Sequence, residues 1–135
     1  MKRLIVVLLV GLMCFFVCGF KKKAKPIIIL SSNQITQENA ATVENTFGAK
    51  TRIYYVLYSP NGFKYPGVRM QISKQDDKTS NWGFKIIESR DISLDMAQNT
   101  YRNYLYIQMP GHYIIQFFYL NNKDYPFAHR EFRVQ

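Results

Sequence analysis

Cysteine is nearly absent from this sequence. Its only two cysteines, Cys14 and Cys18, both lie in an apolar segment near the N-terminus, and residues 19–135 contain none. That long remainder therefore cannot form a disulfide, a thiolate zinc site or a cysteine nucleophile. Its stability must come from a hydrophobic core, and a domain of about 110 residues is large enough to build one.

Acidic residues are also few, since 9 Asp and Glu stand against 18 Lys and Arg and give a formal net charge of +9. Six of the basic residues, and no acid, lie within residues 1–25. The rest of the chain holds 12 basic and 9 acidic side chains, a net charge of only +3. It also lacks a basic run or an aromatic RNA-binding signature, so we expect no nucleic-acid partner.

Catalytic signatures are missing as well, because the chain has no nucleophile elbow, no glycine-rich phosphate loop and no HExxH motif. His129 and Glu131 would share one face of a strand. This spacing is compatible with an acid-base or metal-binding pair, but an ordinary solvent-facing strand produces the same spacing. We expect His112 to be a turn residue. Asp76 and Asp77 lack the ligand spacing and the glycine of a calcium loop. The sequence predicts a non-enzyme without metal or cofactor.

The first 20 residues have the pattern of a targeting segment. Lys2 and Arg3 precede seventeen uncharged residues, Leu4–Phe20, which matches the basic start and apolar run of a secretory signal. As a helix this run would be about 25 Å long, at the low limit for spanning a bilayer. No small-residue cleavage motif precedes Lys21, so a membrane anchor is as consistent with the pattern as a signal peptide.

The stretch FFVCGFKKKAKP, residues 15–26, resembles the signal of bacterial lipoproteins. In that family an apolar run leads to a cysteine that becomes the lipidated N-terminus. Cys18 matches better than Cys14, because the apolar run is complete before it and Gly19 follows, although Val17 stands where the family has a small residue. The resemblance implies lipidation at Cys18 and an exported, membrane-anchored position in the cell envelope, on the periplasmic or surface side. A retained N-terminal helix and an unusual cleaved signal remain as alternatives.

The lysines after Cys18 form a basic tether in either case. Next to anionic lipid headgroups, each would add about 1 kcal/mol of attraction, whereas away from them the segment is a solvated linker. The chain thus divides into a signal peptide or membrane anchor, a basic tether and a folded domain, with boundaries at 1–20, 21–25 and 26–135.

From Pro26 onward, apolar and polar residues alternate with a period near two, which is typical of strands. Turn residues such as Ser59-Pro60-Asn61-Gly62 separate the alternating runs, and a helical turn is expected only around residues 38–43. About seven short strands without a long helix favour an all-β, antiparallel two-sheet sandwich. The predicted strands cover residues 26–31, 51–58, 68–73, 82–88, 100–109, 112–120 and 127–134.

The stretch QMPGHYIIQFFYL, residues 108–120, resembles the late corner of immunoglobulin-like domains. Pro110 and Gly111 would form the bend, and Tyr113 would begin a central strand and return a hydrogen bond to the corner backbone, as in that family. The family's paired cysteines are absent, and Trp82 stands in a different context. The resemblance implies an immunoglobulin-like β-sandwich over residues 26–135. Together with the N-terminus, it implies a small envelope lipoprotein.

Tyrosine is in surplus, with ten in the chain. Alternation places Tyr54 and Tyr58 on one face of their strand, and Tyr104 and Tyr106 on one face of another. If both sets point outward on neighbouring strands, they form an aromatic patch suited to a carbohydrate or a protein partner. Otherwise they fill the rim of the sandwich or form cross-strand pairs.

Three functions follow from these patterns. The leading hypothesis is a membrane-tethered envelope lipoprotein that acts as a non-catalytic binding or structural module. The alternatives are a carbohydrate-binding module that uses the tyrosines, and an accessory subunit of an envelope complex with a retained N-terminal helix. The expected partners are membrane lipid at the N-terminus and a protein or carbohydrate at the domain.

Overall fold

The computed structural model describes residues 24–76 and 83–135. Within these ranges eight strands form two sheets and no helix occurs, which confirms the predicted all-β, two-sheet architecture there. The predicted N-terminal helix and Cys18 lie outside the described residues, as does Trp82. No helix in the described part is long and apolar enough to cross a membrane.

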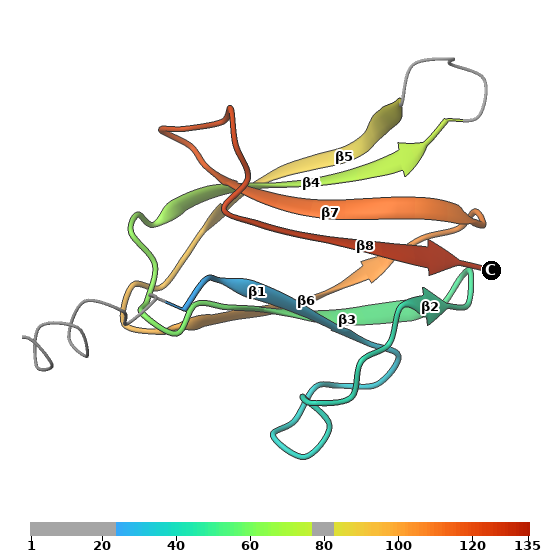
Figure 1. Ribbon diagram of the computed structural model, residues 1–135, viewed down its shortest axis with the longest axis horizontal. Helices are drawn as coiled ribbons and strands as arrows, with labels where there is room; N and C mark the ends of the chain where they lie inside the picture. The colour runs from blue at the N-terminus through green and yellow to red at the C-terminus, as the bar shows by residue number, and fades with distance from the viewer. Residues whose placement is uncertain (1–23, 77–82) are drawn as a thin grey trace, which may run out of the picture.

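The two sheets stack as layers with the core between them (Figure 1). The smaller sheet is antiparallel and contains, in spatial order, β1 (Ile27–Ser31), β3 (Arg52–Tyr58) and β6 (Thr100–Tyr106). The larger sheet contains, in spatial order, β2 (Thr46–Phe47), β8 (Ala128–Val134), β7 (Gly111–Tyr119), β4 (Gly67–Gln75) and β5 (Phe84–Ser93).

The strand count differs from the prediction by one, because β2 was not expected. It pairs with β8 in parallel over Thr46 and Phe47 only, and two residues are too few to show alternation. The sandwich is therefore antiparallel except at this short edge. The helical turn expected around residues 38–43 is present as a single turn over residues 37–41, in which the Ala40 amide donates to the Thr36 carbonyl at 3.0 Å.

Three predicted strand ends were also wrong. β4 continues to Gln75 instead of ending at Ser73. β5 continues to Ser93 instead of ending at Glu88, since a β-bulge opposite Ile72 shifts its alternation and disguises the second half. β6 ends at Tyr106. Met109, the last residue of the strand predicted over 100–109, is consequently 63% exposed, because the chain has left the sheet before reaching it.

The core is built from the inward residues of each strand. On β3, Ile53, Tyr55 and Leu57 are buried, while the intervening positions face outward. The Tyr55 ring contacts Phe117 of the other sheet with centroids 5.9 Å apart. Fully burying one large apolar side chain stabilises the fold by about 1.5–3 kcal/mol, so the two apolar inner faces account for the close stacking of the sheets.

One charged residue, Arg130, occupies an inward position of β8. Its Nη1 donates to the Ile28 carbonyl of β1 at 2.9 Å. Its Nη2 donates to the Glu44 carbonyl at 2.8 Å and to Asn45 Oδ1 at 3.0 Å. Burial lowers the pKa of Arg130, yet a guanidinium stays charged in proteins. Arg130 therefore joins β1 and the segment before β2 to the larger sheet through charge-assisted hydrogen bonds.

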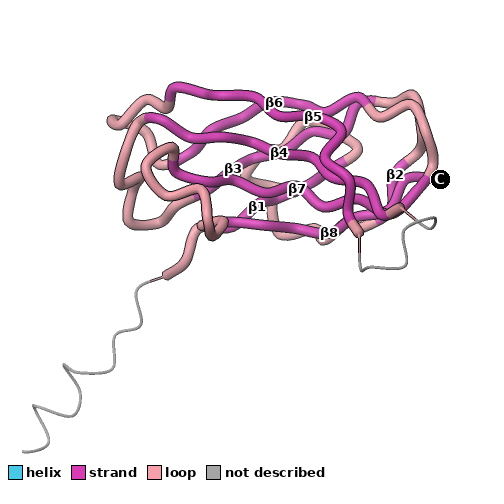
Figure 2. Tube along the Cα trace, turned by 90° about the horizontal axis from the view of Figure 1, so that it is seen from above, coloured by secondary structure: helices cyan, strands magenta, loops and turns pink. Residues whose placement is uncertain are grey.

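The two ends of the sandwich carry different segments (Figures 1 and 2). The described chain enters β1 at residues 24–26, and the loops 59–66 and 120–127 lie at the same end. Asn61 Nδ2 donates to the Ala24 carbonyl there at 3.4 Å. The β6–β7 corner, β2 and the last residues of β8 lie at the opposite end, which we call the distal end.

Candidate functional site

The tyrosines singled out from the sequence lie on the outer face of the smaller sheet. Tyr54 of β3 directly opposes Tyr104 of β6, and their ring centroids are 6.3 Å apart. Tyr106 opposes Arg52, whose guanidinium carbon lies 4.7 Å from the centroid of the Tyr104 ring. Tyr104 and Tyr106 are 45% and 54% exposed. The structure thus gathers three of the four tyrosines around one cation.

Tyr58 does not belong to this group. It lies four residues beyond Tyr54 along β3, with the buried Val56 between them. The Tyr54 and Tyr104 rings are tilted by 59°, and the Arg52 guanidinium occupies a face of the Tyr104 ring. The tyrosines therefore do not form one flat platform of the kind on which a sugar ring stacks.

A cleft of about 290 Å³ lies beside Tyr54 and Tyr104. Its other wall comes from Ile35 in the β1–β2 connection. Arg102 Nη1 donates to the Ile35 carbonyl at 2.7 Å and so holds this connection against the sheet. The volume is at the lower limit for a small-molecule site, so the cleft can admit a compact polar molecule such as a monosaccharide.

The corner before β7 has a structural role. Tyr113 Oη donates to the Met109 carbonyl at 2.6 Å, and the ring stacks on Phe132 with centroids 5.7 Å apart. Burial raises the pKa of the Tyr113 hydroxyl, so it remains a neutral donor at physiological pH. The bend is centred on Met109, directly before Pro110, and Gly111 is already the first residue of β7. This hydrogen bond has the form of the tyrosine corner in immunoglobulin-like domains.

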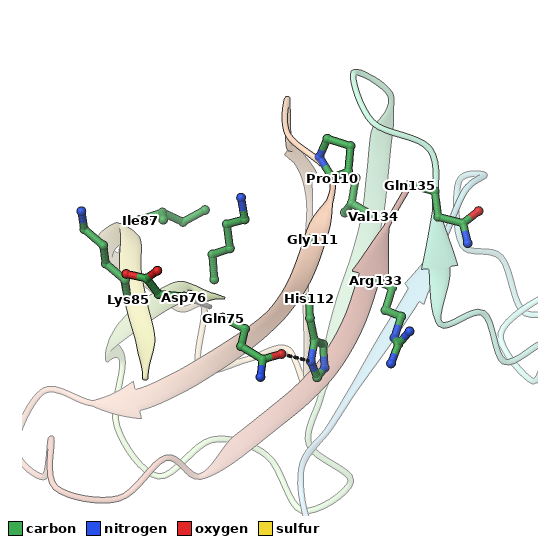
Figure 3. A pocket seen from close by; sticks show the side chains of 11 residues that line it. Gln75, Asp76, Lys85, Ile87, Pro110, Gly111, His112, Arg133, Val134 and Gln135 are labelled. Atoms are coloured by element: carbon green, nitrogen blue, oxygen red, sulfur yellow. Dashed lines mark hydrogen bonds between the residues drawn. The ribbon is translucent and has the colours of Figure 1, made fainter. Parts of the chain in front are cut away.

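A second, larger groove of about 760 Å³ opens at the distal end, beside this corner (Figure 3). We call it the distal groove. It is lined by the end of β4, the start of β5, the first residues of β7 and the last residues of β8. Its walls present three cations, one acid and one exposed aliphatic side chain, namely Lys74, Lys85, Arg133, Asp76 and Ile87.

The cations of the distal groove are not neutralised by ion pairs within residues 24–76 and 83–135. Lys74 and Lys85 oppose each other directly on β4 and β5, an arrangement in which like charges destabilise a sheet. A Cβ atom at Gly111 would meet Lys74 Cε at 2.7 Å. The Lys74 side chain therefore lies against the Gly111 backbone, which limits how far the ammonium can move away from Lys85.

His112 lies in the floor of the groove, within β7 and not in a turn as expected (Figure 3). Its Nδ1 is 3.0 Å from Gln75 Oε1, and its Nε2 is 3.2 Å from Glu131 Oε2. Glu131 is therefore the partner of His112, while His129 is exposed. The described residues contain no group of three or more His, Cys, Asp or Glu able to hold a metal ion.

The distal groove was missed from the sequence because four distant segments build it. Lys74 and Lys85 become neighbours only through the register of β4 with β5, which the bulge after Ile72 shifts. The local sequence gives no signal for the groove, since Asp76 and Asp77 follow Lys74 closely along the chain and Glu88 follows Lys85. The tyrosine face was easier to foresee, because simple alternation specifies it.

No protein-family model matches the chain, and no curated protein matches it either. The fold and its surface features define a small all-β sandwich domain. Among solved structures it is similar to the soluble domain of PmoD from Methylocystis sp. strain Rockwell, with a TM-score of 0.50 and 15% identity over 82% of this chain and 90% of that chain. At that identity the likeness concerns the fold alone.

A second solved structure is β-glucosidase from Kluyveromyces marxianus in complex with glucose. The TM-score is 0.40 and the identity 16%, and the match covers 82% of this chain but only 14% of the enzyme. This likeness has no bearing on function.

Proposed function

We propose that this chain is a membrane-tethered, non-catalytic binding module of the bacterial cell envelope. The observation that carries the proposal is the position of the distal groove, at the end of the sandwich opposite to the point where the chain enters β1 at residues 24–26. The nine-residue strand β7 connects the two ends, which at about 3.3 Å per residue places them roughly 30 Å apart. A domain tethered at one end would thus present the groove away from the membrane.

The tether is inferred from the sequence of the N-terminus. Its basic start, apolar run and cysteine resemble a lipoprotein signal, and Cys18 is the proposed lipidated residue. Only residues 19–23 would separate this lipid from Ala24, where the described chain begins. Five residues span at most about 18 Å, so the entry end of the sandwich would stay beside the bilayer, with the lysines of the tether close to its headgroups.

The strand order supports the immunoglobulin-like assignment. In that fold, strands A, B and E share one sheet, and strands C, F and G share the other. The smaller sheet here has the order β1-β3-β6, and the larger sheet contains β4, β7 and β8 as neighbours, which is the same division in chain order. The Tyr113 corner at the start of β7 adds a second feature of the family. Its fold-level likeness to PmoD, a bacterial protein, is consistent with this assignment.

Fatty-acid labelling of the full chain tests the tether. The chain, a Cys18→Ala variant and a Cys14→Ala variant are expressed in a bacterial host with a labelled fatty acid. We expect label in the parent and in Cys14→Ala, and no label in Cys18→Ala. Label that persists in Cys18→Ala, or no label in any of the three, would overturn the lipoprotein assignment.

The retained-helix alternative has a different signature in the same experiment. An accessory subunit held by its N-terminal helix would carry no label, and it would remain in the membrane fraction after washing at alkaline pH. A cleaved signal would leave the domain in the soluble envelope fraction, shortened by the length of the signal.

Carbohydrate binding is the second candidate function, and the cleft between Ile35 and the Tyr54–Tyr104 pair is the observation that favours it. A glycan array probed with the full chain would identify a ligand. Tyr104→Ala should then abolish binding, whereas Tyr58→Ala, which lies apart from the cleft, should not. A ligand that binds both variants equally would exclude the tyrosine face as its site.

A further inference from the structure

We propose that the distal groove binds an acidic, extended peptide segment of a partner protein. The inference deepens the proposed function, and the outward orientation of the groove rests on it. Its physical basis lies within the described residues and combines cations without ion pairs, exposed apolar side chains and an unpaired strand edge in one place.

The charge of the groove selects an anion. Lys74, Lys85 and Arg133 line it, and within the described residues none of the three forms an ion pair. The acid in the wall is Asp76, so the cations outnumber it. Directly opposed lysines on β4 and β5 repel each other, and a carboxylate placed between them would remove that repulsion. Natural proteins keep such an unfavourable pair of like charges mainly where the surface serves a function.

The walls of the groove also favour a chain with apolar side chains. Ile87 is 49% exposed and the exposed Pro110 contributes further apolar surface, whereas Val134 is buried and only closes the base of the groove. Figure 3 shows Lys85 and Ile87 on one side, Arg133 and Val134 on the other, and His112 between them. A ligand that alternates acidic and aliphatic groups can therefore meet the cations and the apolar walls at the same time.

The edge of the larger sheet provides the backbone partner. Among the described strands, β5 is the last of that sheet and pairs with β4 alone. The first half of β5, which enters the groove, also carries Phe84 and Ile86 as exposed apolar residues. An extended peptide can add to such an edge through main-chain hydrogen bonds while its side chains reach the groove. A free inorganic anion would use neither the edge nor the apolar walls.

Size and position favour a peptide over other anions. The volume of about 760 Å³ is within the range of sites that enclose a ligand of many atoms, and it far exceeds the space that a phosphate needs. Lipid headgroups are disfavoured because the groove lies at the end remote from the proposed anchor. A peptide segment of a protein partner fits both the size of the groove and its distance from the bilayer.

The experiment uses the full chain in detergent micelles and a fluorescein-labelled peptide of six residues in which Glu and Val alternate. Binding is followed by fluorescence anisotropy at low salt. We expect saturable binding that weakens as salt is added, because exposed charge pairs are screened. The double variant Lys74→Gln/Lys85→Gln should weaken binding by about tenfold, since it removes two such pairs. The matched control is Lys64→Gln, which removes a lysine at the entry end and should leave affinity within about twofold.

Several outcomes of the binding experiment would contradict the peptide proposal. A Lys-Val peptide that binds as well as the Glu-Val peptide, or equal affinity of the parent and the double variant, would overturn the proposal. Competition by inorganic phosphate at the concentration of the peptide would assign the groove to a small anion instead. Binding to anionic phosphatidylglycerol vesicles that weakens tenfold in Lys74→Gln/Lys85→Gln would assign it to a membrane, because the N-terminal tether is the same in both proteins. Fatty-acid labelling at Cys18 is scored separately, so a failed peptide experiment leaves the tether standing, and a failed labelling experiment leaves peptide binding standing.

Discussion

Replacing Arg130 should reveal how much the fold depends on one planar guanidinium. Arg130 donates to three neutral acceptors on β1 and on the segment before β2. A hydrogen bond to a charged group contributes about 1.5–3 kcal/mol when buried. Arg130 is only half-buried and water can rehydrate the released acceptors, so we expect roughly half of the sum over three bonds, about 2–4 kcal/mol, to be lost in Arg130→Met.

The Arg130→Lys variant separates charge from geometry. A single ammonium cannot reach acceptors on both segments in the way that the guanidinium fork does. We therefore expect Arg130→Lys to lose at least about 1.5 kcal/mol, close to the loss in Arg130→Met. The free energy of unfolding is measured by urea titration with far-UV circular dichroism on the full chain. Arg133→Met, on the exposed face of β8, is the control and should stay within about 0.5 kcal/mol of the parent.

The result that would refute this reasoning is specific. If Arg130→Lys is as stable as the parent while Arg130→Met is not, positive charge alone holds the two segments. If neither variant loses stability, the three hydrogen bonds are offset by the cost of dehydrating the guanidinium.

Two further predictions concern buried tyrosines. Tyr113→Phe keeps the stack on Phe132 but removes the hydrogen bond to the Met109 carbonyl. It should lower the free energy of unfolding by about 1 kcal/mol in the same urea titration. An unchanged urea midpoint would show that the corner does not depend on the hydroxyl. Burial raises the pKa of Tyr55 and of Tyr113 in the folded state. Above about pH 10 the unfolded chain therefore releases protons that the folded chain retains, and stability should fall as pH rises further. Tyrosinate absorbance should rise together with unfolding, and the fall should be shallower in Tyr113→Phe.

Much of the sandwich was predictable because alternation in the central strands is nearly undisturbed. The inward set of β4, for example, is Val68, Met70 and Ile72, and each of these residues alternates with a polar one. Prediction failed at the edges of the sheets. β5 is exposed on both faces along most of its length, so the contrast that identifies a half-buried strand is missing there.

The candidate sites divide in the same way. The grouping of Tyr54 with Tyr104 follows from alternation and the pairing of β3 with β6. The isolation of Tyr58 does not, because it depends on the connection that carries Ile35 over the middle of that face. The inward position of Arg130 could be predicted from the sequence, since it lies two residues before Phe132 and therefore on the same face of the strand. Its acceptors, however, come from residues more than eighty positions away, and no local pattern identifies them.

The attachment of β1 has a mechanical consequence for a tethered domain. A pull between the anchor and a bound partner would enter at residues 24–26 and act along the strands. The five residue pairs between β1 and β3 would then be loaded side by side in shear, not opened one after another. Arg130 links the Ile28 carbonyl of β1 to the opposite sheet, so part of the tension would bypass β3. A domain tethered in this way would resist a pull along its strands more strongly than its equilibrium stability alone implies.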